Sequence, residues 1–161
     1  MINKIKNNII EITDFPKKDV IFRDISPLLK SEYFIEAVKL MGQKVKTPKY
    51  WVGIESRGFI FASALSMLFG GGVLLCRKKG KLPPPVISMD YTLEYGIDTL
   101  EIKPGDGDVV IVDDVLATGG TLTAVENLLT KAGYEVIDSL VLINLIKLNS
   151  KNNVKYLLGY E

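Results

Sequence analysis

One stretch, VVIVDDVLATGGTLT at residues 109–123, constrains the fold more than any other part of the chain. It begins with Val109–Val112, an unbroken β-branched run that is typical of a strand buried on both faces of a parallel sheet. Asp113 and Asp114 follow this run, and a turn of small residues then leads into a helical pattern, Leu122–Lys131. Ligands of open α/β sheets bind just beyond the carboxyl ends of the strands. The stretch therefore predicts both a parallel α/β sheet and the position of its ligand.

The turn between this strand and its helix, Ala117-Thr118-Gly119-Gly120-Thr121, has the composition of an anion site. Glycines before a helix leave free N–H groups at the positive end of the helix dipole. Two carboxylates beside such a site suit a sugar phosphate, because vicinal hydroxyls favour carboxylate acceptors and the phosphate favours N–H donors. An ordinary βα connection, in which an Asp only caps the helix, also fits this stretch taken alone. The chain has neither the P-loop nor the G-x-G-x-x-G pattern.

The composition narrows the class of protein. A chain of 161 residues with 47% hydrophobic residues is long enough for one domain with a core. The net charge of +1 gives no support for a nucleic-acid or membrane-surface partner, and the apolar stretches are too short to span a membrane. The first residues do not resemble a signal peptide, and Cys76 is alone, so we expect a cytoplasmic protein. The chain has no histidine, which excludes a histidine base and histidine metal ligands.

The hydrophobic pattern predicts the order of the elements. Residues 2–12 are expected to form an amphipathic helix, and residues 17–30 an extended loop. Further helices are expected over residues 32–45 and 59–69, and strands over residues 50–54, 73–76, 109–112, 136–146 and 154–160. Residues 87–94 and 97–102 are expected to form a β-ribbon that overhangs the site. Strands that alternate with helices predict right-handed βαβ units and a mainly parallel sheet.

Five motifs, in this order along the chain, resemble those of adenine phosphoribosyltransferases, which are type I phosphoribosyltransferases. They are DFP with VIFRDISP at residues 14–27, ESRGF at 55–59, RKKGKLP at 77–83, LEYG at 93–96, and the stretch 109–123. The resemblance implies a single domain over residues 1–161, with a central mainly parallel sheet, flanking helices, a small hood and a β-ribbon over the active site. It also implies a purine salvage enzyme that transfers ribose 5-phosphate from phosphoribosyl pyrophosphate to N9 of adenine, giving AMP and pyrophosphate.

The resemblance assigns roles to residues of this chain. Asp113 and Asp114 would face the ribose hydroxyls and favour positive charge on the sugar. The turn at residues 117–121 would hold the 5′-phosphate. Glu94 would act as an acid near N7 of the purine, and Tyr95 and Arg57 would complete the catalytic set. Adenine would contact Ile21, Phe22, Arg23 and Leu145.

The same resemblance places pyrophosphate against a basic segment. Its predicted contacts are Arg57, Arg77, Lys78 and Lys81, and the segment at residues 77–81 is expected to close over the ligand as a mobile loop. A solvated surface loop and a surface salt bridge of Arg57 are the simpler interpretations. Mg²⁺ is expected to arrive with the substrate, held mainly by substrate oxygens and water rather than by dedicated protein ligands. The family also implies a homodimer.

Three other functions remain open from the residues: a phosphoribosyltransferase for another base, a non-catalytic phosphoribosyl-ligand sensor, and a sugar-phosphate-binding domain without catalysis. Adenine is favoured because Ala117 stands where 6-oxopurine enzymes carry an Asp, and Asp114 stands where uracil enzymes carry a proline. Two positions depart from the family pattern. Asn144 replaces an expected glutamate beside Leu145, and the segment around Lys103 is shorter than expected.

Overall fold

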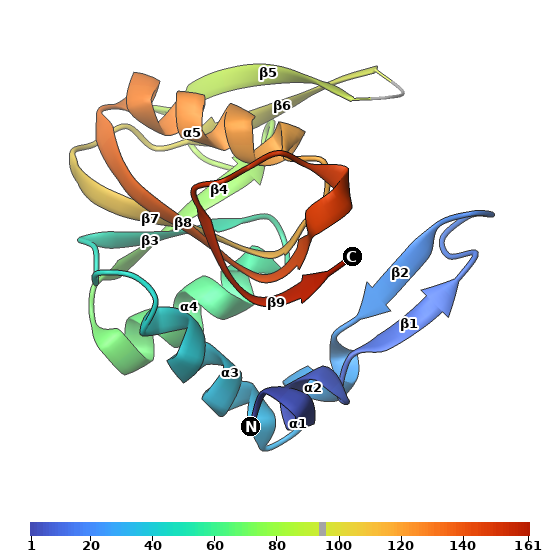
Figure 1. Cartoon of the computed structure of the whole chain (residues 1–161). Helices are drawn as coiled ribbons and strands as arrows, with labels where there is room; N and C mark the ends of the chain where they lie inside the picture. Colours follow the sequence, from blue (N-terminus) through green and yellow to red (C-terminus); the bar gives the residue numbers. More distant parts are fainter. Residues whose placement is uncertain (94–95) are drawn as a thin grey trace.

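The computed structural model describes residues 1–93 and 96–161, and it is built on a seven-stranded sheet of order β5-β6-β4-β3-β7-β8-β9 (Figure 1). The five strands from β4 to β9 pair in parallel, whereas β5 and β6 pair antiparallel to each other and β6 pairs antiparallel to β4. The predicted α/β class with a mainly parallel sheet is therefore confirmed. The strands are β3 (Tyr50–Ile54), β4 (Gly72–Lys78), β5 (Ile87–Leu93), β6 (Gly96–Ile102), β7 (Gly107–Leu116), β8 (Tyr134–Leu145) and β9 (Val154–Tyr160).

The central strand β7 is longer than its β-branched run. It continues to Leu116 because β8 pairs with it up to the position where Leu116 lies opposite Asn144. The prediction that Asp113 and Asp114 follow the strand is therefore wrong in detail, since both lie within its last residues. Their backbone is held by the sheet, so their side chains have a fixed origin.

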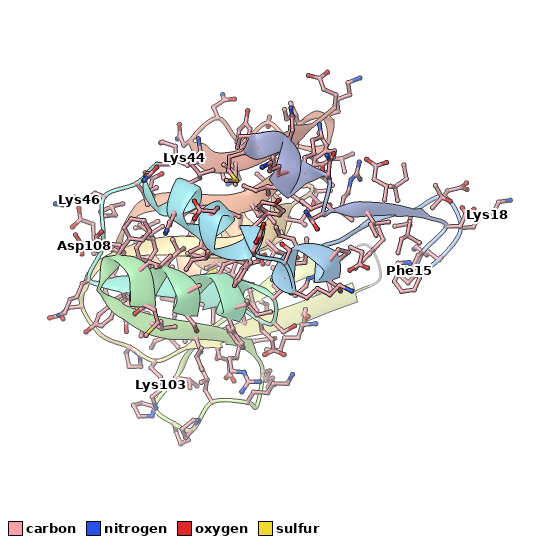
Figure 2. The ribbon with its side chains drawn as sticks, turned by 90° about the horizontal axis from the view of Figure 1, so that it is seen from below. Phe15, Lys18, Lys44, Lys46, Lys103 and Asp108 are labelled. Carbon is pink, nitrogen blue, oxygen red and sulfur yellow. The ribbon has the colours of Figure 1, made fainter. Side chains whose placement is uncertain are left out.

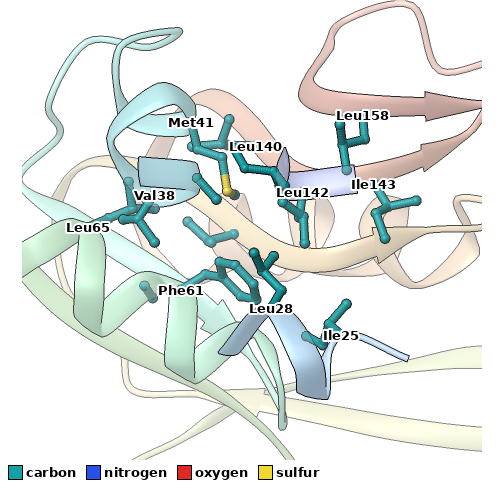
Figure 3. Close-up of a cluster of buried hydrophobic side chains, with 14 of the residues drawn as sticks. Ile25, Leu28, Val38, Met41, Phe61, Leu65, Leu140, Leu142, Ile143 and Leu158 are labelled. Atoms are coloured by element: carbon teal, nitrogen blue, oxygen red, sulfur yellow. The ribbon is translucent and has the colours of Figure 1, made fainter. Parts of the chain in front are cut away.

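Helices cover both faces of the sheet (Figure 1). One face carries α3 (Tyr33–Gly42), which packs on β8 and β9, and α4 (Gly58–Phe69), which packs on β3 and β7. Their apolar side chains share the core shown in Figure 3. Met41 of α3, Phe61 of α4 and Leu140 of β8 are fully buried there. The other face carries α5 (Gly120–Ala132), which packs against β5 and β6 as well as β7 and β8. None of the described helices is long and apolar enough to cross a membrane.

The N-terminal part differs from the sequence prediction. The expected helix over residues 2–12 is wrong, because α1 ends at Lys6 (Ile2–Lys6) and Ile10–Thr13 forms strand β1. The expected loop over residues 17–30 contains strand β2 (Ile21–Asp24) and helix α2 (Ser26–Leu29). Isoleucines favour strands, and β1 finds an antiparallel partner in β2, which local periodicity cannot reveal.

Two β-hairpins extend on the same side of the molecule. The hairpin of β1 and β2 carries Phe15 and Lys18 at its tip, far from Lys44, Lys46 and Asp108 at the opposite end (Figure 2).

The predicted ribbon is formed by β5 and β6, with Ile87 opposite Ile102 and Leu93 opposite Gly96. It runs along α5, where Nζ of Lys131 donates a hydrogen bond to the carbonyl of Ser88 at 3.2 Å.

Candidate active site

The turn between β7 and α5 surrounds a small cavity of about 110 Å³. Gly119 is the N-cap of α5 and has a φ of 91°, a left-handed conformation that glycine adopts without strain. The first N–H groups of α5, which begins at Gly120, have no partners within the helix and can donate to an anion. The cavity is lined by Ile54, Asp113, Val115, Leu116, Ala117, Thr118, Gly119, Thr121, Leu122 and Val141. It brings together four of the five turn residues predicted from the sequence.

The two acidic residues of β7 have different surroundings. Burial, together with the charge of Asp114, raises the pKa of Asp113 well above that of an ordinary aspartate. Oδ1 of Asp113 also accepts a hydrogen bond from the backbone N–H of Asp114 at 2.9 Å. The Asp114 side chain is only 6% exposed, and its Oδ2 lies 2.6 Å from Nε of Arg57. Asp113 therefore takes up a proton more readily than usual, whereas Asp114 is paired with a cation.

Arg57 connects the acids with the N-terminal hairpin. It is the N-cap of α4, and its guanidinium lies 5.2 Å from the centre of the Phe22 ring. The next residue, Gly58, approaches β7 so closely that a Cβ there would lie 2.7 Å from the carbonyl oxygen of Val112. This close packing holds the start of α4, and with it Arg57, against the end of β7.

A second cavity, of about 590 Å³, lies between the hairpin and the ends of β7, β8 and β9. Four predicted base-contacting residues, Ile21, Phe22, Arg23 and Leu145, all line it. Its other lining residues are Asp19, Val20, Arg57, Val115, Ala117, Lys147, Leu148, Tyr160 and Glu161. Aromatic and aliphatic side chains on its walls suit a planar base. Val115 and Ala117 line both cavities, so the two adjoin at the end of β7.

The basic segment at residues 77–81 is bound to the body of the protein. Arg77 and Lys78 belong to β4, and Glu55 receives hydrogen bonds from Nε of Arg77 at 3.2 Å, from the backbone N–H of Lys78 at 3.1 Å and from Nζ of Lys81. Burial alone would raise the pKa of Glu55, but these bonds to cationic residues lower it to about 2. A second carboxylate, Glu101, accepts from the N–H of Gly80 at 2.7 Å. The segment is therefore held by Glu55 and Glu101 in this structure, and its closure over pyrophosphate stays a prediction.

Comparison with known proteins decides the family. A model of the phosphoribosyl transferase domain matches residues 30–156. The adenine phosphoribosyltransferase of Bdellovibrio bacteriovorus is 48% identical over 148 residues, which cover 90% of each chain. The chain belongs to the adenine phosphoribosyltransferase family. The resemblance of the five motifs is thereby confirmed.

Solved structures agree with this family. The adenine phosphoribosyltransferase of Thermoanaerobacter pseudethanolicus superposes with a TM-score of 0.91 at 35% identity, covering 99% of this chain and 100% of the other. The Saccharomyces cerevisiae enzyme, solved with adenine and an imino-altritol bisphosphate, superposes with a TM-score of 0.84 at 32% identity, covering 96% of each chain. The type I phosphoribosyltransferase fold is confirmed, and the chain is a transferase of purine salvage that makes AMP.

Two residues predicted as catalytic, Glu94 and Tyr95, lie outside the described residues. The described ends of the ribbon, Leu93 and Gly96, pair with each other. The ribbon packs on α5, and β5 runs along that helix from Ser88 beside Lys131 to Tyr91, whose side chain bonds to Thr121 in the first turn of α5.

Tyr160 is a cavity residue that the sequence analysis missed. It ends β9 and lies opposite Leu145 in the parallel register of β8 and β9. Its ring faces the guanidinium of Arg23 at 5.1 Å and the ammonium of Lys6 at 4.9 Å. The signal was present in the sequence, because the last strand of a parallel sheet delivers its carboxyl end to the same edge as β8.

The departure at Asn144 does not change the wall of the larger cavity, since Asn144 is not among the described residues that line it. Asn144 is 5% exposed, and its Oδ1 accepts a hydrogen bond from Nδ2 of Asn149 at 3.0 Å. Lys103, in the shortened segment, donates from Nζ to the carbonyl of Pro83 at 2.6 Å. The short segment thus closes against the proline-rich loop rather than the base cavity.

The described residues contain no group of three or more His, Cys, Asp or Glu side chains that could hold a metal ion. Asp113 lines the small cavity and Asp114 follows it in β7, and their carboxylates are oxygen ligands of the type that Mg²⁺ accepts.

Proposed function

We propose that this chain binds phosphoribosyl pyrophosphate across its two cavities and joins its ribose to adenine. The observation that carries the proposal is that Val115 and Ala117 line both cavities. A 5′-phosphate in the small cavity and a base in the large one would leave the ribose at the end of β7, beside Asp113 and Asp114. This arrangement supports an AMP-sized product.

The chemical roles follow from charge. Asp113 and Asp114 would accept hydrogen bonds from the ribose hydroxyls and stabilise positive charge on the sugar as the bond to pyrophosphate breaks. Thr118, Gly119, Gly120 and Thr121, with Ala117, would hold the phosphate through N–H and hydroxyl groups. N9 of the N7–H tautomer of adenine would attack C1′ as the C1′–O bond to pyrophosphate breaks. The N7 proton would pass to Glu94, supported by Tyr95, and Glu94 would return it as an acid in the reverse direction.

Pyrophosphate would draw the basic residues from their present partners. Arg77 and Lys81 are bonded to Glu55, directly after the end of β3, whereas Nζ of Lys78 lies 3.5 Å from Oδ2 of Asp98 in β6. A more highly charged anion competes with a single carboxylate for them. Arg57 would meet the same ligand at the start of α4.

Mg²⁺ would be carried mainly by the oxygens of phosphoribosyl pyrophosphate and by water, and the carboxylates of Asp113 and Asp114 would be available as oxygen ligands. When bound, it neutralises part of the pyrophosphate charge. The protein residues still supply the binding and orientation of ribose and base.

A base-competition assay tests this function. The chain is mixed with phosphoribosyl pyrophosphate, Mg²⁺ and either adenine or hypoxanthine, and product formation is followed by absorbance. We expect adenine to exceed hypoxanthine in kcat/KM by more than about tenfold, because a 6-oxo group reverses the donor pattern and leaves buried groups unpaired. Equal use of both bases would favour the alternative of another base, and AMP binding without turnover would favour a sensor.

We also propose that residues 1–161 act as one domain and that the protein works in the cytoplasm.

We further propose that two copies of the chain form a homodimer. An apolar surface on α4 and β4 supports the dimer: Met67 is 87% exposed, and Ile60, Leu68 and Leu75 are each about 40% exposed. Analytical ultracentrifugation of the wild type and of Met67→Glu tests it. A dimer that the substitution weakens is expected, and a wild-type monomer would contradict the proposal.

A further inference from the structure

The side-chain amide of Asn149 contacts both the turn before α5 and the end of β8, and so connects the walls of the two cavities. It lies in the loop between β8 and β9, after the short helix η1 (Ile146–Leu148). Its Nδ2 lies 2.9 Å from the carbonyl oxygen of Ala117, 3.0 Å from that of Leu145, and 3.0 Å from Oδ1 of Asn144. Its Oδ1 accepts from the backbone N–H of Lys151 at 3.0 Å. Oxygen acceptors on one side and an N–H donor on the other determine the orientation of the amide.

The same loop supports the phosphate turn at a second point. A Cβ built on Gly119 would lie 3.2 Å from Cγ of Lys151, so the Lys151 side chain packs against the turn. Nζ of Lys151 lies 3.0 Å from Oε1 of Glu126 in α5, which holds that side chain in place. The loop at residues 149–151 therefore lies against the outer side of the turn.

We propose that Asn149 is a positioning residue for phosphate binding, acting through the peptide group between Ala117 and Thr118. In a planar trans peptide the C=O and N–H groups point in opposite directions. When Asn149 holds the carbonyl of Ala117 on the loop side, the N–H of Thr118 points away from the loop. Thr118 lines the small cavity, so this N–H is available to the phosphate. The proposal rests on the assignment of the 5′-phosphate to this turn.

The bond to Leu145 gives Asn149 a second effect. Leu145 lines the larger cavity, so one amide fixes both the phosphate turn and a wall of the base cavity. The buried Asn144 supplies a third acceptor, so one of the two N–H groups of Nδ2 is shared between two oxygens. Asn144, the residue that departs from the family pattern, thus acts as a hydrogen-bond acceptor for Asn149. A glutamate at this position would also offer an oxygen acceptor.

Ribose 5-phosphate and AMP are the probes that test this role, with affinities measured by calorimetry on Asn149→Asp and Asn149→Ala. The Asp variant keeps the acceptor for Lys151 but loses both N–H donors. We expect each variant to bind both ligands about tenfold more weakly, the factor that one hydrogen bond of about 1.4 kcal/mol represents. Asn153→Asp, an exposed site on the same loop with the same change of charge, is the matched control and should stay within about twofold.

The pH dependence of ligand affinity distinguishes a positioning role of Asn149 from a purely structural one. As pH falls from about 7 to about 3, through the ordinary aspartate pKa of about 3.9, the introduced carboxyl takes up a proton and again has one O–H donor. The affinity ratio of wild type to Asn149→Asp should therefore shrink, while the ratio for Asn149→Ala stays constant. Affinities within about twofold of wild type in both variants, or a ratio that does not change with pH, would overturn the proposal. A wild type that binds neither ligand would instead overturn the proposed function.

Discussion

Nε of Arg57 lies 2.6 Å from Oδ2 of Asp114, and this ion pair joins the start of α4 to the end of β7. The Asp114 side chain is 6% exposed, whereas that of Arg57 is 44% exposed. Arg57 also faces the ring of Phe22 in the N-terminal hairpin. One cation therefore neutralises a buried acid of the proposed ribose site and contacts Phe22 in the wall of the larger cavity.

Removing this cation should cost both stability and activity. Arg57→Gln leaves the buried carboxylate of Asp114 without its partner, and we expect the free energy of unfolding to fall by about 1–3 kcal/mol. Chemical denaturation and the transferase assay measure the two effects. Arg57→Lys is the matched control, because it keeps the charge but lacks the planar guanidinium that faces Phe22. Equal stability of all three proteins would show that the ion pair contributes nothing measurable.

Asp113, the acid next to this pair, should lower the free energy of unfolding at neutral pH. The pKa of Asp113 is raised by burial and by Asp114 above its ordinary value of 3.8, so its contribution to stability becomes unfavourable as pH rises above that value. Asp113→Asn should therefore be more stable than wild type at neutral pH, on the order of 1 kcal/mol, and the gain should vanish in acid. Ribose 5-phosphate should bind it more weakly.

Denaturation curves at several pH values check this prediction, with Asp106→Asn as a control whose side chain is 90% exposed in the wild type. A gain that does not depend on pH, or an unchanged affinity for ribose 5-phosphate, would contradict the assigned role.

Glu55 should control the accessibility of the basic segment. Glu55→Gln removes the carboxylate that holds Arg77 and Lys81, so trypsin should cut faster after Lys79 and Lys81. In the wild type, phosphoribosyl pyrophosphate with Mg²⁺ should slow this cleavage. Glu11→Gln, which breaks a 3.6 Å pair with Arg23 far along the chain, should leave the cleavage unchanged.

The same variant has a defined pH signature. The pKa of Glu55 falls from 4.5 to about 2 on folding, so its stabilising effect is present above about 4.5 and is lost as pH falls through about 2. The stability difference between wild type and Glu55→Gln should shrink in that interval. Identical curves for the two proteins would mean that Glu55 does not bind these cations in solution.

Gly119→Val should block the phosphate turn. Gly119 has a φ of 91°, which costs a β-branched residue about 1–2 kcal/mol, and the added side chain meets Lys151. We expect AMP affinity, measured by calorimetry, to fall by more than about tenfold. Gly70→Val is the matched control, because Gly70 has a φ of 85° with no atom within 4 Å of a built Cβ. Normal AMP binding by folded Gly119→Val would refute the assignment of the turn.

Glu94→Gln tests the predicted acid of the ribbon. A positioned general acid contributes about 10²–10⁴ in rate, so kcat should fall by that range while AMP still binds. Glu135→Gln, an exposed carboxylate at the start of β8, is the control and should retain full turnover. A loss of less than about threefold in Glu94→Gln would assign the proton to another group.

The sequence by itself determined the elements whose causes are local. The β-branched run before Asp113 specifies a buried strand, and the glycines after Thr118 permit the left-handed N-cap of α5. The five motifs identified the family, and four predicted base contacts do line one cavity. The strand, turn and helix were predicted correctly because residue type and short-range order dictate them, whereas the base contacts stay a prediction.

Only the tertiary structure decided which distant residues meet. The β1–β2 hairpin was missed because its strands stabilise each other across a turn rather than by their own periodicity. Glu55 binds Lys81, which lies 26 residues further along the chain, and Asn149 binds Ala117 across 32 residues. A local sequence pattern does not encode contacts over such separations. Parallel pairing places Tyr160 opposite Leu145 for the same reason. The register and packing of the whole sheet, rather than local propensity, bring these side chains together.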